Sequence, residues 1–255
     1  MSLIYADLHI HSVLSPCADR EMIPEKIYKQ LSKMGIHIFA ICDHNSTKNV
    51  NAFYEYGKKY YPDILFIPGI EITTMEEVHI LGLFEDLSIA DEVGNVIRDS
   101  LVDIDNMPEF FESQNVIDMM GQKIDEEVKA LYYATNYEVE EAVLTLKKYN
   151  ALVIAGHIDR PSFSVISQLG FIPENLFDVL EISPVSVKNV LDKNEFKVRD
   201  VIYKVPEHIP LITSSDSHSV GEIGFVKTGF YIDSLTFNGL KEAIKRKPIM
   251  EVCQY

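Results

Sequence analysis

Short runs of apolar and β-branched residues alternate with segments of helical periodicity along most of the chain. Pro24 suits a first helical turn, where its missing N–H is not needed, and the EKIYKQLSKM that follows has helical apolar spacing up to Gly35. Further helices are expected over residues 47–61, 136–149 and 235–247. Buried strands are expected at SLIYADL, IHIFAICD, ILFIPGIEI, VHILGLF, ALVIAGH, DVLEIS, IPLITSSD and FVKTGFYI. The repeated strand-helix-strand order predicts an α/β fold with a parallel sheet.

Residues 85–149 interrupt this rhythm with acidic sequence such as MPEFFESQNVIDMMGQKIDEEVKALYY, in which no clear strand is found. We expect a helical insertion there, which either covers a site or forms a solvated helical subdomain. No internal repeat, low-complexity tract or Gly/Ser/Pro-rich linker marks a domain boundary. The chain is therefore predicted to be one barrel domain over residues 1–255.

Composition limits the class of protein. The 255 residues are 47% hydrophobic, which is enough to bury a sizeable core. No run of about 18 consecutive apolar residues occurs and the first residues do not resemble a signal peptide, so we expect a cytoplasmic protein without a membrane partner. The widely spaced Cys17, Cys42 and Cys253 do not suggest a disulfide framework.

The formal net charge of −16 bears on the substrate. Binding to long nucleic acid draws much of its affinity from Lys and Arg that neutralise phosphates, so long nucleic acid is disfavoured as a partner. A small phosphorylated substrate is expected instead, because bound divalent cations make the local potential positive even in an acidic protein.

The histidines are the most informative residues, because the chain has only eight. His37 and His208 precede expected strands and look like ordinary surface or packing residues. The other six fall at or just after expected strand ends, beside carboxylates: His9, His11, His44, His79, His157 and His218.

The motif DLHIHS places His9 and His11 two residues apart. In a strand they project to the same face, and a neutral imidazole nitrogen is a favoured ligand for zinc and iron. Asp7 points the same way and would orient a ligand by accepting a hydrogen bond. Taken alone, the pair is equally explained by hydrogen-bonded histidines at a sheet end, since two ligands cannot fill a shell of about four.

Carboxylates and histidines follow two further strands. Asp43 and His44 end the second run, and Glu71 precedes His79 by eight residues. A lone carboxylate at such a position is usually a salt-bridge partner or a helix cap. Glu71 could instead bridge two cations, because its two oxygens carry several lone pairs.

The last two motifs are AGHIDR and SSDSH. The first places His157 three residues before Arg160, whose planar fork suits a phosphate, although a surface salt bridge would also explain it. The second places Asp216 two residues before His218. Because the carboxyl ends of barrel strands open onto one face, these motifs predict one pocket that holds two or three ions.

Together, the segments DLHIHS, CDHN, GIEI with EVHILG, AGHIDR and SSDSH make the chain resemble the PHP (polymerase and histidinol phosphatase) family. They occur in the family's order over nearly the whole chain. The resemblance implies a distorted (β/α)₇ barrel, similar to a TIM barrel, with two or three divalent metal ions at the carboxyl ends of the strands.

The resemblance also implies the ligand sets. Glu71 would be shared between the first and second ions, and His44 and His218 would serve a third. For the third ion, the loop after the first motif offers Cys17 or Asp19; a thiolate suits zinc, whereas an oxygen ligand suits manganese or iron. The first ion would be held by His9, His11, Glu71 and Asp216, and the second by Glu71, His79 and His157.

The expected activity is hydrolysis of a phosphate ester, a small-molecule phosphomonoester or a nucleotide, by a hydroxide that bridges the first two ions. Arg160 and Arg20 would bind the phosphate oxygens. Leaving-group protonation is assigned to His218, Asp216 or metal-bound water.

Three other functions remain open from the sequence. A nuclease would act on short oligonucleotides or nucleotide bisphosphates. A C–N or C–O hydrolase would use a modified metal-bridging lysine, but no lysine lies at a strand end beside the motifs. A non-catalytic metal-binding module would lack ligands, and the set here is complete apart from the choice between Cys17 and Asp19. The natural substrate and the oligomeric state are not determined.

Overall fold

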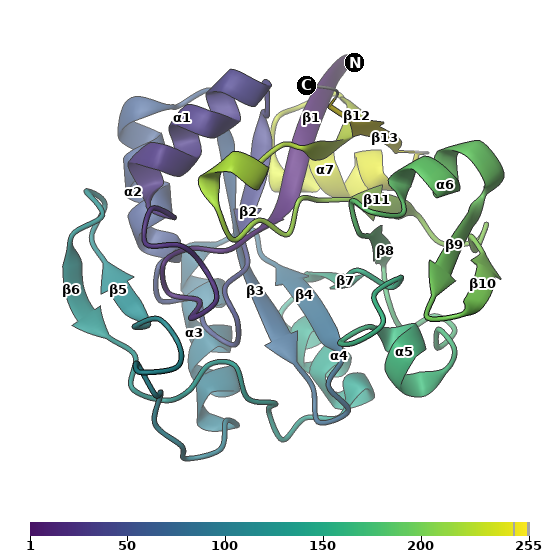
Figure 1. The fold of residues 1–255 in the computed structure, drawn as a ribbon. Coiled ribbons are helices and arrows are strands. Elements are labelled where there is room, and N and C mark those ends of the chain that lie inside the picture. Colours follow the sequence, from purple (N-terminus) through teal and green to yellow (C-terminus); the bar gives the residue numbers. More distant parts are fainter. Residues whose placement is uncertain (247, 254–255) are drawn as a thin grey trace.

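The computed structural model describes residues 1–246 and 248–253. Within them, a sheet of nine strands curls into a nearly closed barrel in the order β11-β8-β7-β4-β3-β2-β1-β12-β13 (Figure 1). The predicted α/β, TIM-like barrel is therefore confirmed, and all eight expected strands form. The strands are β1 (Ser2–Ile10), β2 (Ile38–Ile41), β3 (Leu65–Thr73), β4 (His79–Leu83), β7 (Leu152–Ala155), β8 (Val179–Ile182), β11 (Leu211–Thr213), β12 (Val226–Ile232) and β13 (Ile249–Val252).

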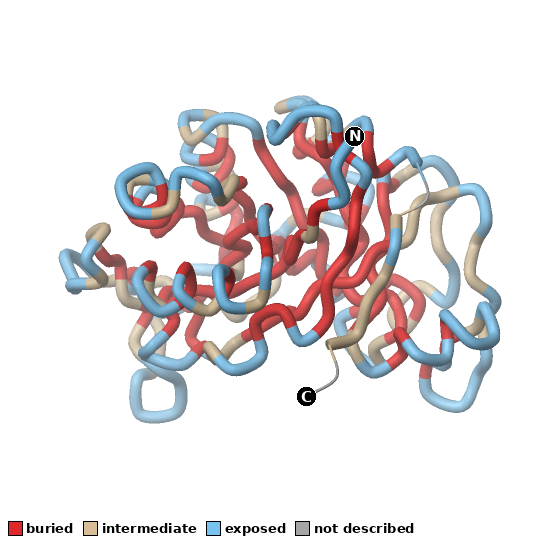
Figure 2. The backbone as a smooth tube through the Cα atoms, turned by 90° about the horizontal axis from the view of Figure 1, so that it is seen from above, coloured by how far each residue is buried: buried red, intermediate tan, exposed pale blue. Residues whose placement is uncertain are grey.

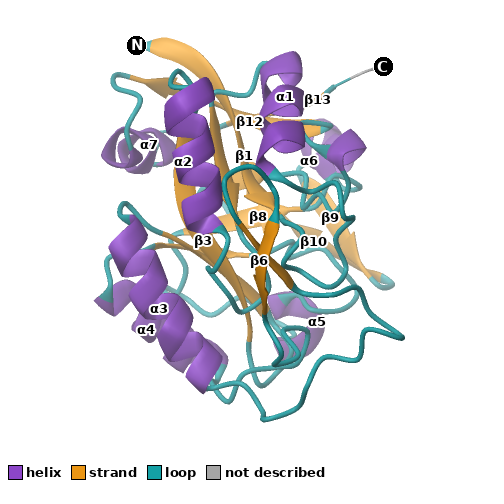
Figure 3. Ribbon diagram, turned by 90° about the vertical axis from the view of Figure 1, so that its left-hand side faces the viewer, coloured by secondary structure: helices purple, strands orange, loops and turns teal. Residues whose placement is uncertain are grey.

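The helices lie outside the sheet (Figure 3). The first begins at Pro24 and ends where Gly35 adopts a left-handed conformation with φ 66°, as its sequence predicts. The helix expected over residues 235–247 forms as α7, while residue 247 is outside the described part of the chain. The helices are α1 (Pro24–Met34), α2 (Val50–Tyr60), α3 (Leu87–Asp99), α4 (Val139–Lys148), α5 (Val165–Leu169), α6 (Val187–Lys193) and α7 (Phe237–Ile244).

The sheet is mixed, whereas the sequence pattern predicts a parallel one. Strand β4 runs antiparallel to both β3 and β7, and β12 runs antiparallel to β1. The reason is the short connection after Thr73, which pairs with His79 across a hairpin and leaves no room for a crossover helix. His79 therefore starts its strand, and this start lies at the same barrel end as the carboxyl ends of the parallel strands.

The segment 85–149 differs in its middle from the expected helical insertion. It begins with α3 and ends with α4, whose apolar faces pack on the barrel core. Between them lie irregular chain and a hairpin of β5 (Asn115–Ile117) and β6 (Lys123–Glu126), at the left edge of Figure 1. A turn forms there instead of a helix because Asp118 accepts two backbone N–H groups and Gly121 takes a φ of 79°.

One buried carboxylate fixes this segment beside the barrel mouth. Glu127 accepts hydrogen bonds at 2.7 and 2.9 Å from Arg98 on α3 and pairs with Lys48 at 2.5 Å. Burial raises the pKa of Glu127, but these two cations outweigh it and lower the pKa to about 2. Asn45, next to His44, donates at 2.9 Å to the Leu131 carbonyl. The segment therefore supports the loop after β2.

The barrel closes at a seam between β11 and the first and last long strands. Thr213 donates its N–H to the Thr228 hydroxyl at 2.9 Å, and that hydroxyl donates to the Thr213 carbonyl at 2.7 Å. His11 donates its N–H to the Ser217 carbonyl at 3.0 Å. Because few backbone bonds cross this seam, side chains hold it.

The backbone at the centre of the molecule is mostly buried (Figure 2), and side chains fill the barrel interior. Inward-facing residues such as Leu8, Ala40, Leu81 and Ile154 are at most 1% exposed and pack together under the barrel mouth. Neighbours on the same strands that face the other way, such as Phe39, Ile80 and Val153, pack into the apolar clusters that include helix residues. Among residues 1–246 and 248–253, no helix combines the length and apolar character needed to cross a bilayer.

Candidate metal centre

The structure brings eight of the predicted site residues to one end of the barrel. Two come from β1 and the residue after it, one from β3, one from the start of β4, and the rest from the loops that follow β2, β7 and β11. All are buried except for parts of two imidazoles, on His44 and His218. The eight are His9, His11, His44, Glu71, His79, His157, Asp216 and His218.

Glu71 is the centre of this cluster. Its side chain is 1% exposed, and both oxygens face imidazole nitrogens rather than solvent. Oε2 lies 2.8 Å from His44 Nδ1 and 3.4 Å from His11 Nε2. Oε1 lies 2.8 Å from His79 Nδ1, 3.3 Å from His157 Nε2 and 3.3 Å from His9 Nε2.

A second carboxylate completes the group around β1. Asp216 Oδ1 lies 3.3 Å from His9 Nε2 and 3.1 Å from His11 Nε2. The two Nε2 atoms lie 3.2 Å apart. The pair that the sequence places on one face of a strand therefore converges on the same point as the carboxylate from the far end of the chain.

A third group lies at the solvent side. His11, His44 and His218 can offer ligand atoms within 4.8 Å of one another, and the His11 and His218 rings stack at 4.2 Å. Cys17 is exposed, and His44 and His218 act electrostatically on its thiol. Burial raises the pKa of Cys17, and these imidazoles outweigh it and lower the pKa to about 6. Asp19 reaches His218 only through its backbone N–H, at 2.8 Å.

The donor set fits metal ions. Ligand atoms about 2.1 Å from a shared ion lie about 3.0–3.4 Å from each other at octahedral or tetrahedral angles. The spacings of 3.1–3.3 Å among His9, His11 and Asp216 match that geometry. His44 Nδ1 and Glu71 Oε2 are 2.8 Å apart and buried, yet neither makes a hydrogen bond. Both atoms are therefore oriented as ligands are.

The protonation states of Glu71, His11 and His79 suit ligands. Burial raises the pKa of Glu71, but the imidazoles, led by His79, hold it well below its usual range. Burial lowers the pKa of His79 to about 4 and that of His11 well below its usual range. Burial also lowers the pKa of His9, but Asp216 and Glu181 outweigh this effect and raise that pKa well above its usual range. Burial also lowers the pKa of His44 and His218, but Glu71 and Cys17, respectively, outweigh it and raise both. The centre thus favours an ionised Glu71 beside neutral His11 and His79, and added positive charge at His9, His44 and His218.

Two proposed ligand positions have unusual backbone conformations. His157 has φ 27° and Asp216 has φ 49°, both in the left-handed region that favours glycine. They lie two and three residues after the ends of β7 and β11, in loops at the barrel mouth. Backbone strain of this kind persists where surrounding contacts impose it, and it clusters at functional sites.

Glu181 on β8 supports the cluster, and sequence reasoning missed it. Its Oε2 lies 3.0 Å from His9 Nδ1 and accepts the His157 N–H at 3.0 Å. It therefore orients one imidazole and fixes the strained backbone of another. The available signal was an acidic residue within the otherwise apolar strand VLEI.

Asp7 and Asp43 accept hydrogen bonds from loop backbone groups and from a serine hydroxyl next to the cluster. Asp7, expected to orient a histidine, instead accepts the N–H groups of Ser215 at 2.9 Å and Gly224 at 3.0 Å, and so holds the loop that carries Asp216. Asp43 accepts the Ser15 hydroxyl at 2.7 Å, which lies 3.0 Å from His11 Nδ1. Asp43 and Ser15 therefore orient His11, whereas the Asp7 carboxylate is already hydrogen-bonded to two backbone N–H groups.

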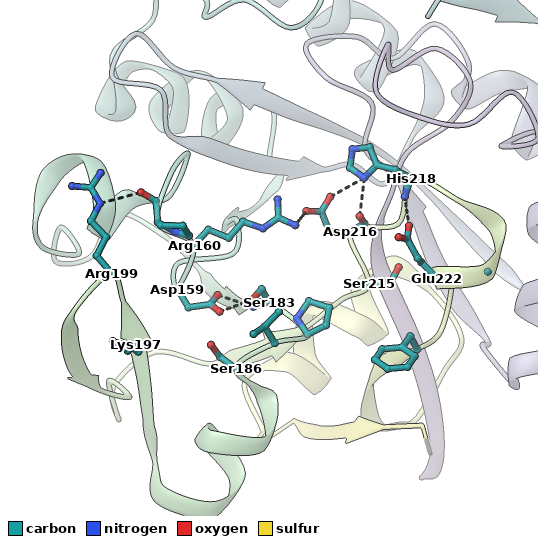
Figure 4. A pocket seen from close by; sticks show the side chains of 15 residues that line it. Asp159, Arg160, Ser183, Ser186, Lys197, Arg199, Ser215, Asp216, His218 and Glu222 are labelled. Carbon is teal, nitrogen blue, oxygen red and sulfur yellow. Dashed lines mark hydrogen bonds and ion pairs between the residues drawn. The ribbon is translucent and has the colours of Figure 1, made fainter. Parts of the chain in front are cut away.

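The two predicted phosphate-binding arginines have different positions. Arg160 forms an ion pair with Asp216 Oδ2 and points from its loop toward the centre (Figure 4). Arg20 instead pairs with Glu112 at 2.8 Å, and its side chain is 78% exposed. A cavity of about 930 Å³ opens beside Arg160, Asp216 and His218. Of the two arginines, the structure brings only Arg160 to the centre.

A family model for the PHP domain matches residues 7–184, more than half of the chain. The chain belongs to the PHP domain family. This membership confirms the resemblance drawn from the motifs and, with it, the predicted class of metal-dependent hydrolase of phosphoesters. The matched residues include all the proposed ligands except Asp216 and His218, which lie beyond residue 184.

Known PHP proteins include nucleases. The chain is 33% identical over 90 residues to the 5′-3′ exoribonuclease Rnm of Salmonella typhimurium, and the match spans only 29% of that relative. Endonuclease Q of Pyrococcus furiosus has a TM-score of 0.64 at 19% identity over 98% of this chain and 58% of its own. A metal-dependent phosphoesterase assigned by similarity, from Bifidobacterium adolescentis, has a TM-score of 0.58 at 17% identity over 95% and 96% of the two chains.

The expected partner is corrected by these comparisons. Endonuclease Q has also been solved with a 27-mer duplex substrate, a structure with a TM-score of 0.64 to this chain at 18% identity over 98% of this chain and 58% of its own. The prediction of a small phosphorylated substrate, with long nucleic acid disfavoured as a partner, is therefore wrong. The error lies in using the charge of −16, because that is a sum over the chain, whereas binding depends on the potential at the site.

Proposed function

We propose that this chain is a nuclease that hydrolyses phosphodiester bonds of a nucleic-acid strand with the help of divalent metal ions. The carrying observation is the buried cluster around Glu71, which opens at Asp216 and Arg160 into a cavity of about 930 Å³. The nuclease activities named for endonuclease Q and Rnm support the same class of substrate. An open cavity leaves room for the strand on either side of the scissile phosphate.

The proposed ions are held by the three groups described above. Bound divalent cations would supply Lewis acidity and activate water at neutral pH. Glu71 would be shared between two ions because each of its oxygens faces a different set of imidazoles. His218 donates Nδ1–H to the Asp216 carbonyl at 2.9 Å, which leaves Nε2 for the third ion.

Arg160 is proposed to bind the scissile phosphate. Its guanidinium is paired with Asp216 Oδ2 and its side chain is 37% exposed, so one face of the fork is open to the cavity. A guanidinium can donate two parallel hydrogen bonds to nonbridging phosphate oxygens. The pair with Asp216 fixes the guanidinium at the position where the phosphate would meet the ions.

Cys17, rather than Asp19, is proposed to complete the third group, because His44 and His218 lower the pKa of its thiol to about 6, whereas Asp19 meets His218 through its backbone N–H. A thiolate favours zinc there. Protein purified with Cys17→Ser is expected to contain about one zinc equivalent less than wild type by elemental analysis, while Asp19→Asn keeps the wild-type content. Equal zinc in Cys17→Ser and wild type would exclude the thiol as a ligand.

The proposed function is tested on a substrate panel. Labelled single-stranded RNA, single-stranded DNA and duplex DNA are incubated with protein purified without chelator, and products are resolved by length. We expect cleavage of at least one nucleic acid at a kcat/KM well above that for phosphomonoesters. Treatment with a chelator should abolish it, and added zinc or manganese should restore it. Turnover restricted to phosphomonoesters would contradict the proposal.

A further inference from the structure

The cavity next to the metal centre has a second wall that contains none of the proposed metal ligands. It is formed by the turn of a hairpin of β9 (Glu195–Val198) and β10 (Val201–Lys204), with loops after β8 and before β12 (Figure 4). This hairpin is inserted between α6 and β11. It places Lys197 and Arg199 on the rim of the cavity that begins at Arg160.

The hairpin is held rigidly. Phe196 and Val198 are at most 4% exposed and pack into the main core, while Lys197 between them faces outward. Arg199 occupies the tight turn with φ 52° and donates Nε–H to the Pro161 carbonyl at 3.2 Å, which ties the hairpin to the loop of Arg160. The turn therefore presents its cations in a fixed position relative to the centre.

The carboxylates around this cavity are already engaged by the protein. Asp159 accepts the Ser183 N–H at 2.7 Å and also bonds its hydroxyl. Glu222 accepts the N–H groups of His218 and Ser219, each at 3.0 Å. In the hairpin turn, Lys197 forms an ion pair with Asp200 at 3.4 Å, and both side chains are exposed, so a phosphate can compete for the ammonium group.

Part of the remaining lining is apolar. Val185 is 89% exposed and Phe225 is 37% exposed, on the loops after β8 and before β12. Exposed aromatic and apolar side chains beside cations are the combination that binds single-stranded nucleic acid, since bases stack on rings while phosphates meet Lys and Arg.

We propose that this cavity binds the nucleotide that adjoins the scissile phosphate, with Lys197 and Arg199 contacting its phosphate and with Val185 and Phe225 contacting its base. This subsite rests on the proposed nuclease function. The subsite would hold a single-stranded nucleotide, whose unpaired base is available to stack on Phe225.

The test compares two charge-matched double variants. Lys197→Ala/Arg199→Asn removes the rim cations, and asparagine tolerates the left-handed turn. Lys245→Ala/Arg246→Asn removes one exposed lysine and one exposed arginine, outside the lining of this cavity. With a fluorescent single-stranded oligonucleotide that wild type cleaves, we expect KM to rise about tenfold or more in the first variant, with a much smaller change in kcat, and to stay at the wild-type value in the second.

The salt dependence of kcat/KM distinguishes a lost phosphate contact from a structural defect, which would not change this dependence. Losing the contact to this one phosphate should reduce the slope of log(kcat/KM) against log[salt] by about 0.7, the value per phosphate for single strands. Thermal melting and bound metal establish that the first variant is folded. Val185→Glu, at a site that is 89% exposed, places a negative charge in the cavity without touching the hairpin and should also raise KM.

The outcomes separate the two proposals. If wild type cleaves no nucleic acid, the proposed function fails. If wild type cleaves but both cavity variants retain its KM and salt slope, the subsite is wrong and the nuclease assignment stands.

Discussion

Replacing Glu71 with Gln is expected to lower turnover by at least about 10³-fold and to reduce the bound metal by more than one equivalent per chain. The substitution keeps the shape of the side chain but removes the charge and one oxygen. Both oxygens of Glu71 face imidazole nitrogens at 2.8 Å, so one amide group would replace a ligand of two proposed ions. Initial rates on a nucleic acid and elemental analysis of the same sample measure both effects.

The matched control for this variant is Glu109→Gln, which removes an exposed carboxylate outside the centre. It should keep the wild-type rate and metal content. The shared-ligand role of Glu71 is refuted if Glu71→Gln protein melts as wild type does and retains the full metal complement.

Replacing Arg160 with Ala is expected to lower kcat/KM about 10²- to 10³-fold, as loss of a positioned donor to a developing charge does. Arg160→Lys should recover only part of this loss, because an ammonium group lacks the planar fork. The guanidinium also neutralises Asp216 Oδ2, so a lower kcat is expected together with a higher KM. Steady-state kinetics on one oligonucleotide measure both constants.

Arg20→Ala provides the control for this prediction. Arg20 lies in the loop between β1 and α1, where it is exposed and paired with Glu112. Its loss should therefore leave kcat/KM within about twofold of wild type. Equal losses in the two variants would mean that positive charge near the mouth acts over a distance and that Arg160 has no specific contact.

The sequence predicts the barrel and the gathering of the ligands because both depend on periodic features. Strand ends are readable from apolar runs, and residues at those ends share one face of a barrel. The prediction reached His79 despite an error in strand direction. It expected a parallel strand, whereas His79 starts the antiparallel β4, and the hairpin brings that start to the same mouth.

Other parts of the site depend on contacts that have no periodic signature. Glu181 could be read only as an acid in a buried strand, since its two partners are 172 and 24 residues away. The partner of Asp7 is the loop that carries Asp216, which no local pattern reveals. The β9–β10 hairpin has short strands with mixed residues, and the Arg199 side chain ties it to the loop of Arg160 by a hydrogen bond to the Pro161 carbonyl.

The seam of the barrel gives the proposed ions a mechanical consequence. His9 and His11 lie on one side of it, and Asp216 and His218 lie on the other, at opposite ends of the chain. An ion shared across this gap would close a loop of about two hundred residues, and such a link restricts the unfolded chain most when the loop is long. An ion bound across the seam would thus stabilise the folded barrel relative to the unfolded chain, and removal of the metal would lower the free energy of unfolding.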